Sequence, residues 1–263
     1  MPESQSRRSV ISLSDSHTYQ LYTTVKIFRT ALAAVVAAAA LSASADDFID
    51  RINFNRYAAD NAKRGVTTAD TPRVVFFGNS ITEGWPAHHG EFFTSHPGFI
   101  GRGISGQTTY QFLGRFREDV LNLLPDIVVI NGATNDIAEN MSPYNEDYTM
   151  GNIMSMAELA RANGVKVILT SVLPMGKVPW HPSVENVPEK VSSLNNRIRT
   201  YAEAMNIPYV DYYSALVAST PEQGRPQVEG AINAAYSPDG VHPNADGYAV
   251  MEALVLPVID SLR

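Results

Sequence analysis

The chain contains no cysteine among its 263 residues. This absence excludes disulfide bonds, a thiol nucleophile, cysteine-bound zinc and the lipid anchor that some exported proteins carry on a cysteine. Histidine is also scarce, with six residues, and no two of them have the helical spacing of a metal site. We therefore expect neither a metal nor any other cofactor.

Positive charge is in short supply. The chain has 20 Lys and Arg residues against 27 Asp and Glu residues, which gives a formal net charge of -7 at pH 7. An acidic surface disfavours nucleic acid and anionic membranes as partners. We expect the partner to be a small-molecule or glycan substrate. The sequence leaves the oligomeric state open.

Long apolar runs are missing as well. The best candidate, residues 31–41, falls short of the roughly 20 apolar residues that a membrane-spanning helix needs. It follows two basic side chains in residues 26–29 and precedes the small residues 43–45, as in a secretory signal peptide. We expect cleavage after Ala45, a secreted or periplasmic product without stable membrane anchoring, and one domain over residues 46–263.

Residues 1–24, which precede this signal, are polar and rich in serine. Signal peptides normally begin at their charged end, so this prefix is unusual. We favour a mis-assigned gene start, with the true start near Val25. A genuine, unusually long leader is the alternative.

Short apolar runs alternate with longer helical patterns through the rest of the chain. The expected strands are residues 74–77, 99–104, 126–131, 166–172 and 208–211, and the expected helices are residues 46–64, 108–124, 148–163, 188–205, 244–262 and one from about residue 82 that Pro86 could break. Apolar strands that alternate with helices indicate a parallel sheet covered on both faces. We therefore predict a three-layer α/β/α sandwich around a five-stranded parallel sheet. Two long loops, residues 174–187 and 220–238, should border the substrate at the carboxyl edge of that sheet.

Residues 78–85 read Gly-Asn-Ser-Ile-Thr-Glu-Gly-Trp and follow the first apolar run. Ser80 is thus placed between a buried strand and a helix, at the sheet edge where open α/β folds hold their chemistry. A serine hydroxyl needs a base to become a nucleophile, and the base needs a carboxylate to orient it. Asp239 and His242 can supply both from one loop. Each alone has another interpretation, a helix N-cap for Ser80 and a surface turn for the other two.

Two further segments lie between these ends. Residues 103–109 read Gly-Ile-Ser-Gly-Gln-Thr-Thr, and residues 134–136 read Thr-Asn-Asp. The four blocks, in this order, resemble those of the SGNH hydrolases, also called the GDSL esterase/lipase family. The resemblance extends from about Arg73 to the C-terminus, with Asn79 standing where the family usually has aspartate. It implies the flavodoxin-like SGNH hydrolase fold.

The resemblance also implies roles for individual residues. Ser80 would be the nucleophile, His242 the general base and then acid, and Asp239 the carboxylate that orients His242. The oxyanion hole would consist of the backbone N–H groups of Ser80 and Gly106 and the side-chain amide of Asn135. We expect Gly106 to permit a close backbone approach because it lacks Cβ. A turn glycine at Gly106 and a helix cap at Asn135 are the alternatives.

The two tryptophans are weaker candidates for substrate binding. Trp85 follows Ser80 by five residues and could form a wall of the acyl pocket. Trp180 lies in a proline-containing loop after the fourth expected strand, and its flat face suits a sugar ring or an acyl chain. For both side chains, packing inside the protein is the alternative.

These features together predict a secreted serine esterase that forms an acyl-enzyme. By resemblance to the acetylhydrolase-like branch of the family, short acyl esters are the expected substrates, above all O-acetyl groups on carbohydrates. A lysophospholipase or thioesterase with the same site is one alternative, and an acyltransferase is another. The alternative that is not an enzyme is a carbohydrate-binding protein that has the same fold and is catalytically silent.

Overall fold

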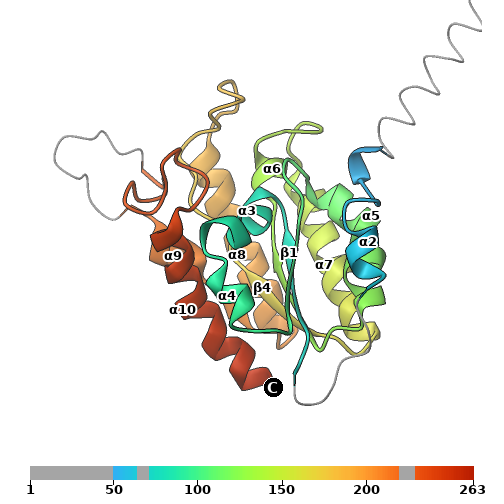
Figure 1. The fold of residues 1–263 in the computed structure, drawn as a ribbon. Helices are drawn as coiled ribbons and strands as arrows, with labels where there is room; N and C mark the ends of the chain where they lie inside the picture. Colours follow the sequence, from blue (N-terminus) through green and yellow to red (C-terminus); the bar gives the residue numbers. More distant parts are fainter. Residues whose placement is uncertain (1–49, 64–70, 219–228) are drawn as a thin grey trace, which may run out of the picture. The chain divides into compact units, whose positions relative to one another are not determined.

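Parallel strands form the centre of the protein (Figure 1). The computed structural model describes residues 50–63, 71–218 and 229–263, and within these ranges the sheet has five strands in the order β2-β1-β3-β4-β5. The strands are β1 Val74–Gly78, β2 Phe99–Gly103, β3 Ile127–Asn131, β4 Lys166–Thr170 and β5 Tyr209–Val210. The predicted strands are confirmed, with ends that differ by at most two residues. This is the strand order of flavodoxin-like folds, in which β2 is added on one side of β1 and the later strands are added on the other side.

Helices cover both faces of this sheet. They are α2 Ala58–Asn61, α3 Ser80–His88, α4 Glu91–Thr94, α5 Thr109–Asp119, the 3₁₀ turn η1 Leu121–Leu123, α6 Thr134–Ile137, α7 Glu146–Ala162, α8 Val187–Ala204, α9 Tyr212–Leu216 and α10 Ala245–Leu262. The predicted α/β/α sandwich is therefore confirmed. The short helices α4, α6 and α9 were not expected, because four or five residues are too few to show a helical period.

Strand β1 shows why the layers form. Successive side chains of a strand point to opposite faces. Val75 and Phe77 accordingly pack into the apolar core that α5, α7 and α8 close. Val74 and Phe76 pack into the core closed by α3, α4, α9 and α10. All five residues of β1 are buried, which explains the continuous apolar run in the sequence.

The N-terminal helix predicted over residues 46–64 is confirmed only in part, because residues 50–52 and 58–61 are helical and residues 53–57 are not. Asn53 has φ of 56° and interrupts any helix there, so the segment continues through a turn into the four residues of α2. The segment does pack against the sheet edge, as expected, because Tyr57 Oη donates a 2.5 Å hydrogen bond to the Gly103 carbonyl of edge strand β2.

The structure also bears on the expected helix near residue 82, the loop over residues 220–238 and the N-terminal segment. Helix α3 begins at Ser80 rather than near residue 82, and it continues through Pro86. The loop over residues 220–238 is described only from residue 229, and the signal peptide lies outside the described residues. Among the helices that the structure describes, none has both the length and the apolar character needed to cross a membrane.

Candidate active site

Ser80 is the first residue of α3, directly beyond the carboxyl end of β1. The helix is capped by its neighbour, since Asn79 Oδ1 accepts a 3.1 Å hydrogen bond from the Ile81 N–H. Asn79 is fully buried, so an amide at this position caps the helix without burying a charge. The N-cap is therefore Asn79, and the Ser80 hydroxyl remains available for another partner.

That partner is His242. Its Nε2 lies 2.9 Å from Ser80 Oγ, and its Nδ1 lies 2.7 Å from Asp239 Oδ2. The other oxygen of Asp239 accepts hydrogen bonds from the N–H groups of Val241, at 2.9 Å, and His242, at 2.8 Å. The structure thus brings the three predicted side chains into one hydrogen-bonded row, although 162 positions separate Ser80 from His242.

The surroundings keep Asp239 ionised. Partial burial acts to raise the pKa of this carboxyl, but the hydrogen bonds from His242 and from the Val241 N–H outweigh burial and hold the pKa below its ordinary value. The side chains of His242 and Asp239 are 37% and 47% exposed, so the row lies at the surface. A carboxylate there stabilises the charged imidazolium that proton transfer would create.

Gly106 and Asn135 follow strands β2 and β3, which lie on either side of β1 in the sheet. Gly106 has φ of +76°, and a Cβ built on it meets no atom within 4 Å. The left-handed backbone at this position therefore favours glycine, and the expected close approach to substrate stays a prediction. Asn135 is buried in α6, and its Nδ2 donates a 2.9 Å hydrogen bond to the Gln107 carbonyl. One of the two amide hydrogens thus fixes the side chain, and the second is left for another acceptor.

Asp136, the neighbour of Asn135, connects α6 to the start of α5. Its carboxylate accepts hydrogen bonds from the Thr109 N–H, at 3.0 Å, and from Thr109 Oγ1, at 2.5 Å. It therefore caps the start of α5 from another segment, which agrees with a structural role. Burial raises the pKa of Asp136 to about 6, although the hydrogen bonds from Thr109 favour the charged form.

Comparisons with known proteins identify the family of this chain. The sequence profile of the GDSL-like Lipase/Acylhydrolase family matches residues 76–250. The chain belongs to this family. Its class is that of the carboxylic ester hydrolases, and the predicted family and fold are confirmed.

Two solved structures from Bacteroides are similar over most of the chain. A protein of Bacteroides fragilis assigned to the acylhydrolases is 54% identical, with a TM-score of 0.76 over 81% of this chain and 98% of its own. A GDSL-like lipase of Bacteroides thetaiotaomicron is 53% identical, with a TM-score of 0.76 over 81% of this chain and 99% of its own.

A curated relative is more distant. A multidomain esterase of Ruminococcus flavefaciens is 27% identical over 127 residues, which are 48% of this chain and 14% of that esterase. The chain therefore corresponds to a small part of that larger protein.

Beneath this GDSL-type site lies a buried arginine. Arg115 donates to the carbonyls of Gly78, at 2.8 Å, and Arg102, at 3.0 Å, and to Gln107 Oε1, at 2.6 Å. It also pairs with Asp119 at 3.0 Å. Burial lowers the pKa of Arg115 to about 10, and the charge of Asp119 opposes this. In the sequence, Arg115 and Asp119 look like an ordinary surface pair four residues apart, so their role was missed.

Glu83 was also missed. It lies one turn after Ser80, and its Oε2 accepts hydrogen bonds from Ser105 Oγ and, at 2.8 Å, from the Ser105 N–H. Its Oε1 accepts from Arg56 Nη2 at 2.7 Å. Burial acts to raise the pKa of Glu83, but these hydrogen bonds outweigh it and hold the pKa below its ordinary value. Glu83 therefore ties the loop of Gly106 to the helix of Ser80.

Trp85 does not form a wall of the site. It is only 2% exposed, and its ring stacks on Tyr248 and Phe92 with centroid separations of 5.3 and 5.2 Å. Its Nε1 donates a 2.8 Å hydrogen bond to Glu252. The packing alternative is therefore right for this tryptophan, because α10 covers the ring.

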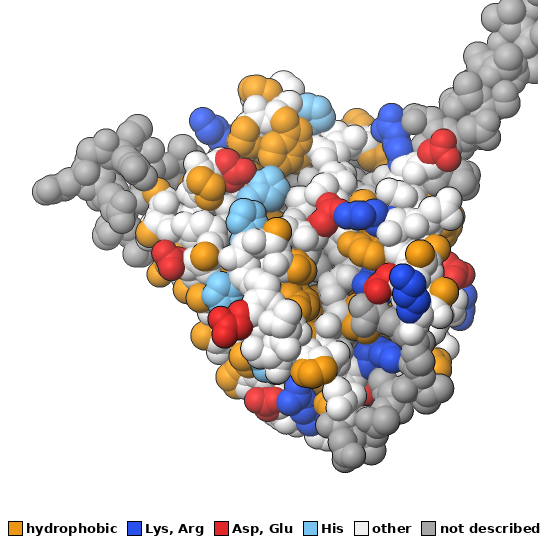
Figure 2. Space-filling view, in the orientation of Figure 1, with side chains coloured by type: hydrophobic (Ala, Val, Ile, Leu, Met, Phe, Trp, Pro, Cys, Tyr) orange, Lys and Arg blue, Asp and Glu red, His pale blue; other side chains and the backbone are white. Residues whose placement is uncertain are grey.

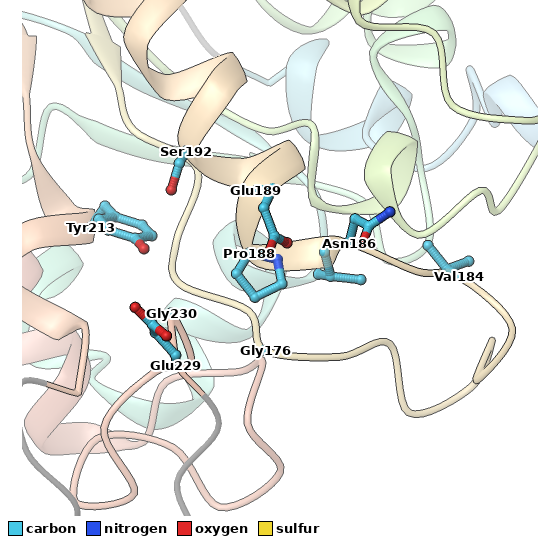
Figure 3. A pocket seen from close by; sticks show the side chains of 10 residues that line it. Gly176, Val184, Asn186, Pro188, Glu189, Ser192, Tyr213, Glu229 and Gly230 are labelled. Carbon is cyan, nitrogen blue, oxygen red and sulfur yellow. The ribbon is translucent and has the colours of Figure 1, made fainter.

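Trp180 differs, being 40% exposed in the loop between β4 and α8. A groove of about 550 Å³ lies at the start of α8 and is lined in part by Tyr213 and Glu229. Figure 3 shows the residues that line it. Neither Ser80 nor His242 is among the described residues that line it. Within the described ranges, no three His, Asp or Glu side chains are grouped as metal ligands would be.

Proposed function

We propose that this chain is a secreted serine esterase that hydrolyses short-chain carboxylic esters, with O-acetyl groups on carbohydrates as its main substrates. One observation carries the esterase assignment. The row from Ser80 Oγ through His242 to Asp239 is continuous at 2.9 and 2.7 Å, in a chain of the GDSL-type family.

The reaction starts at Ser80. His242 Nε2 takes the hydroxyl proton while Ser80 Oγ attacks the carbonyl carbon of the ester. The same nitrogen then gives that proton to the departing alcohol, which leaves the acyl group on Ser80. A water molecule, deprotonated by His242, hydrolyses the acyl-enzyme and restores the hydroxyl. Asp239 holds the imidazole ring in place and stabilises its positive charge in both halves of the reaction.

The attack places a negative charge on the former carbonyl oxygen. We assign its stabilisation to three donors, which are the backbone N–H groups of Ser80 and Gly106 and the free amide hydrogen of Asn135. The hydrogen bond from Asn135 to the Gln107 carbonyl supports this role, because it fixes the amide before substrate arrives. The start of α3 adds the positive end of a helix dipole.

The substrate class rests on two supports. Residues 82–85, Thr-Glu-Gly-Trp, resemble the acetylhydrolase-like branch of the family. The exposed face of Trp180 suits a sugar ring better than the phosphate of a phospholipid head group. The acidic composition, with a net charge of -7, makes nucleic acid and anionic membranes poor partners.

A panel of p-nitrophenyl esters tests the acyl length. We expect kcat/KM to fall roughly 10- to 100-fold from acetyl to octanoyl, which is the discrimination that a pocket of limited length supplies. A preference for octanoyl esters would contradict the proposal and favour a lysophospholipase or thioesterase. No turnover of any ester by the folded protein would favour a binding protein without catalytic activity.

Secretion is tested separately. The signal within residues 1–45 motivates the proposal, and those residues lie outside the described ranges. N-terminal sequencing of protein recovered from the periplasm or medium should begin at Asp46. A start well before this residue would contradict cleavage after Ala45.

A further inference from the structure

Trp180 is a large aromatic side chain that is exposed yet held in one orientation. It lies between Pro179 and Pro182, whose fixed φ angles stiffen the loop. Its Nε1 donates a 2.7 Å hydrogen bond to Asn140 Oδ1, while 40% of the residue remains open to solvent. In Figure 2, apolar side chains gather at the top of the view, where the loop between β4 and α8 stands in Figure 1. Exposed apolar surface that the fold orients is typical of a binding site.

The segment that holds Trp180 is itself fixed. His181 Nδ1 donates a 2.8 Å hydrogen bond to the Ala138 carbonyl. The backbone N–H of Asn140 donates to the Asn135 carbonyl at 3.1 Å. Lys190 of α8 pairs with Glu139 at 3.4 Å. Residues 138–140 are thus joined both to the loop of Trp180 and to the helix that carries Asn135.

The same segment contacts the proposed oxyanion hole. Asn140 Nδ2 donates a 3.3 Å hydrogen bond to the carbonyl of Gly106, while Asn140 Oδ1 accepts from Trp180. One asparagine side chain therefore separates the indole from Gly106, whose N–H we assign to the ester oxygen. Two successive hydrogen bonds thus join the Trp180 ring to the loop of Gly106, so the ring borders the proposed oxyanion hole.

The chemistry of the exposed Trp180 ring indicates which part of a substrate it would bind. A pyranose ring has a flat face of C–H groups, which packs well on an aromatic face, while its hydroxyls stay in water. An acyl chain would gain more from an enclosed apolar pocket than from a ring at the open surface. Resting on the esterase function above, we propose that Trp180 is the binding platform for the sugar ring in the alcohol half of the ester.

Three substitutions of Trp180 test this proposal. Trp180→Ala removes the ring, Trp180→Leu keeps apolar bulk without a flat face, and Trp180→Phe restores a flat face without the N–H group. The substrates are mono-O-acetylated methyl glucopyranosides, one for each acetylated position, and ethyl acetate, which has no ring. Steady-state kcat and KM are measured for every pair.

For at least one acetylated glucoside, we expect Trp180→Ala to raise KM roughly 10-fold, the upper part of the range for an aromatic contact. Trp180→Leu should behave like Trp180→Ala, whereas Trp180→Phe should stay within about 3-fold of the wild type. Hydrolysis of ethyl acetate should change less than about 2-fold in all three variants. Phe54→Ala is the matched control, since Phe54 is an aromatic of similar exposure, at 38%.

Two results with the Trp180 variants would overturn the sugar platform. One is an equal effect of Trp180→Leu and Trp180→Phe on the acetylated glucosides. The other is a parallel loss on ethyl acetate, which would mean that Trp180 supports the loop of Gly106 instead. Wild-type protein that hydrolyses ethyl acetate but no acetylated glucoside would also overturn the platform, and would leave the esterase function intact. Failure on ethyl acetate and on the whole ester panel would overturn the esterase function itself.

Discussion

The two sides of the candidate site are built differently. On the triad side, Asp239 and His242 belong to one loop, are 47% and 37% exposed, and are bonded mainly to each other. On the oxyanion side, Asn135 and Asp136 are 3% and 5% exposed and are bonded to residues 107 and 109. The first side depends on a local turn, and the second depends on contacts between distant segments.

Because of this difference, substitutions on the two sides should affect catalysis and stability to different extents. Substituting a half-exposed side chain with few partners changes chemistry and leaves the free energy of unfolding nearly constant. Substituting a buried polar side chain leaves its partner unsatisfied and costs about 1–3 kcal/mol. We therefore expect variants on the triad side to be inactive and stable, and variants on the oxyanion side to lose both activity and stability.

Ser80→Ala should give the largest effect on activity. Removing the serine of a comparable triad lowers kcat by about 10⁶-fold. The hydroxyl is bonded to His242 at the surface, and Asn79 caps α3, so the melting temperature should be unchanged. Esterase assays and thermal unfolding of the same preparation check both expectations. A folded variant with near-normal turnover would contradict the mechanism.

Asn135→Ala should affect both quantities. Loss of one oxyanion donor of three should lower kcat by roughly 10²- to 10³-fold with little change in KM. The Gln107 carbonyl would lose its partner, so urea unfolding should show a loss of about 1–3 kcal/mol. Asn163→Ala is the matched control, because Asn163 bonds a carbonyl at an exposed position. A change confined to KM would mean that Asn135 only holds substrate.

The sequence predicted what short segments determine. Strands β1 and β3 were predicted because buried parallel strands are continuously apolar. The break in the helix predicted over residues 46–64 was missed because the left-handed backbone at Asn53 leaves no mark in an apolar pattern. Trp85 failed because the burial of a helical side chain depends on α10, which lies far along the chain.

The candidate site was likewise predictable where short motifs determine it and unpredictable where distant segments meet. Motifs and their order sufficed to propose five residues, three of which the structure places in one hydrogen-bonded row. The side chains that support them have partners that no motif connects. Glu83 is joined to Arg56 and Ser105, and Arg115 to Gly78 and Gln107. Such pairings arise from tertiary structure and could not be predicted from a single sequence.

The raised pKa of Asp136 makes the stability of the oxyanion side depend on pH. Its pKa of about 6 lies above the ordinary value of 3.8, so the folded state binds this proton more tightly than the unfolded state. The resulting stabilisation is complete below pH 4 and is lost as the pH rises through 6. The difference amounts to about 3 kcal/mol.

Asp136→Asn removes this titration. The stability of the variant relative to the wild type should therefore increase by about 3 kcal/mol between pH 4 and pH 7. Urea unfolding at a series of pH values measures this difference. Asp246→Asn, at an exposed position, is the control for the loss of a carboxylate. A constant offset for Asp136→Asn across the pH series would contradict the raised pKa of Asp136.

Glu83 joins the two sides, and its substitution should have the smallest effect. Glu83→Gln keeps one acceptor oxygen and removes the charge, so Ser105 and Arg56 both lose the carboxylate and one of them also loses its acceptor. The Gly106 loop would then shift slightly relative to Ser80. We expect kcat to fall about 10-fold with KM unchanged, because alignment matters most in the transition state.

The ion pair with Arg56 provides the matched control for Glu83. The Arg56 side chain is 48% exposed, and such surface pairs contribute little. Arg56→Gln should therefore lower kcat less than about 2-fold, since Ser105 still bonds to a full carboxylate. Steady-state kinetics on acetyl esters compares the two variants. Equal losses in both would mean that the charge near Arg56 matters and the contact with Ser105 does not. An unchanged kcat in Glu83→Gln would show that the oxyanion loop is positioned by Arg115 and Asp136 alone.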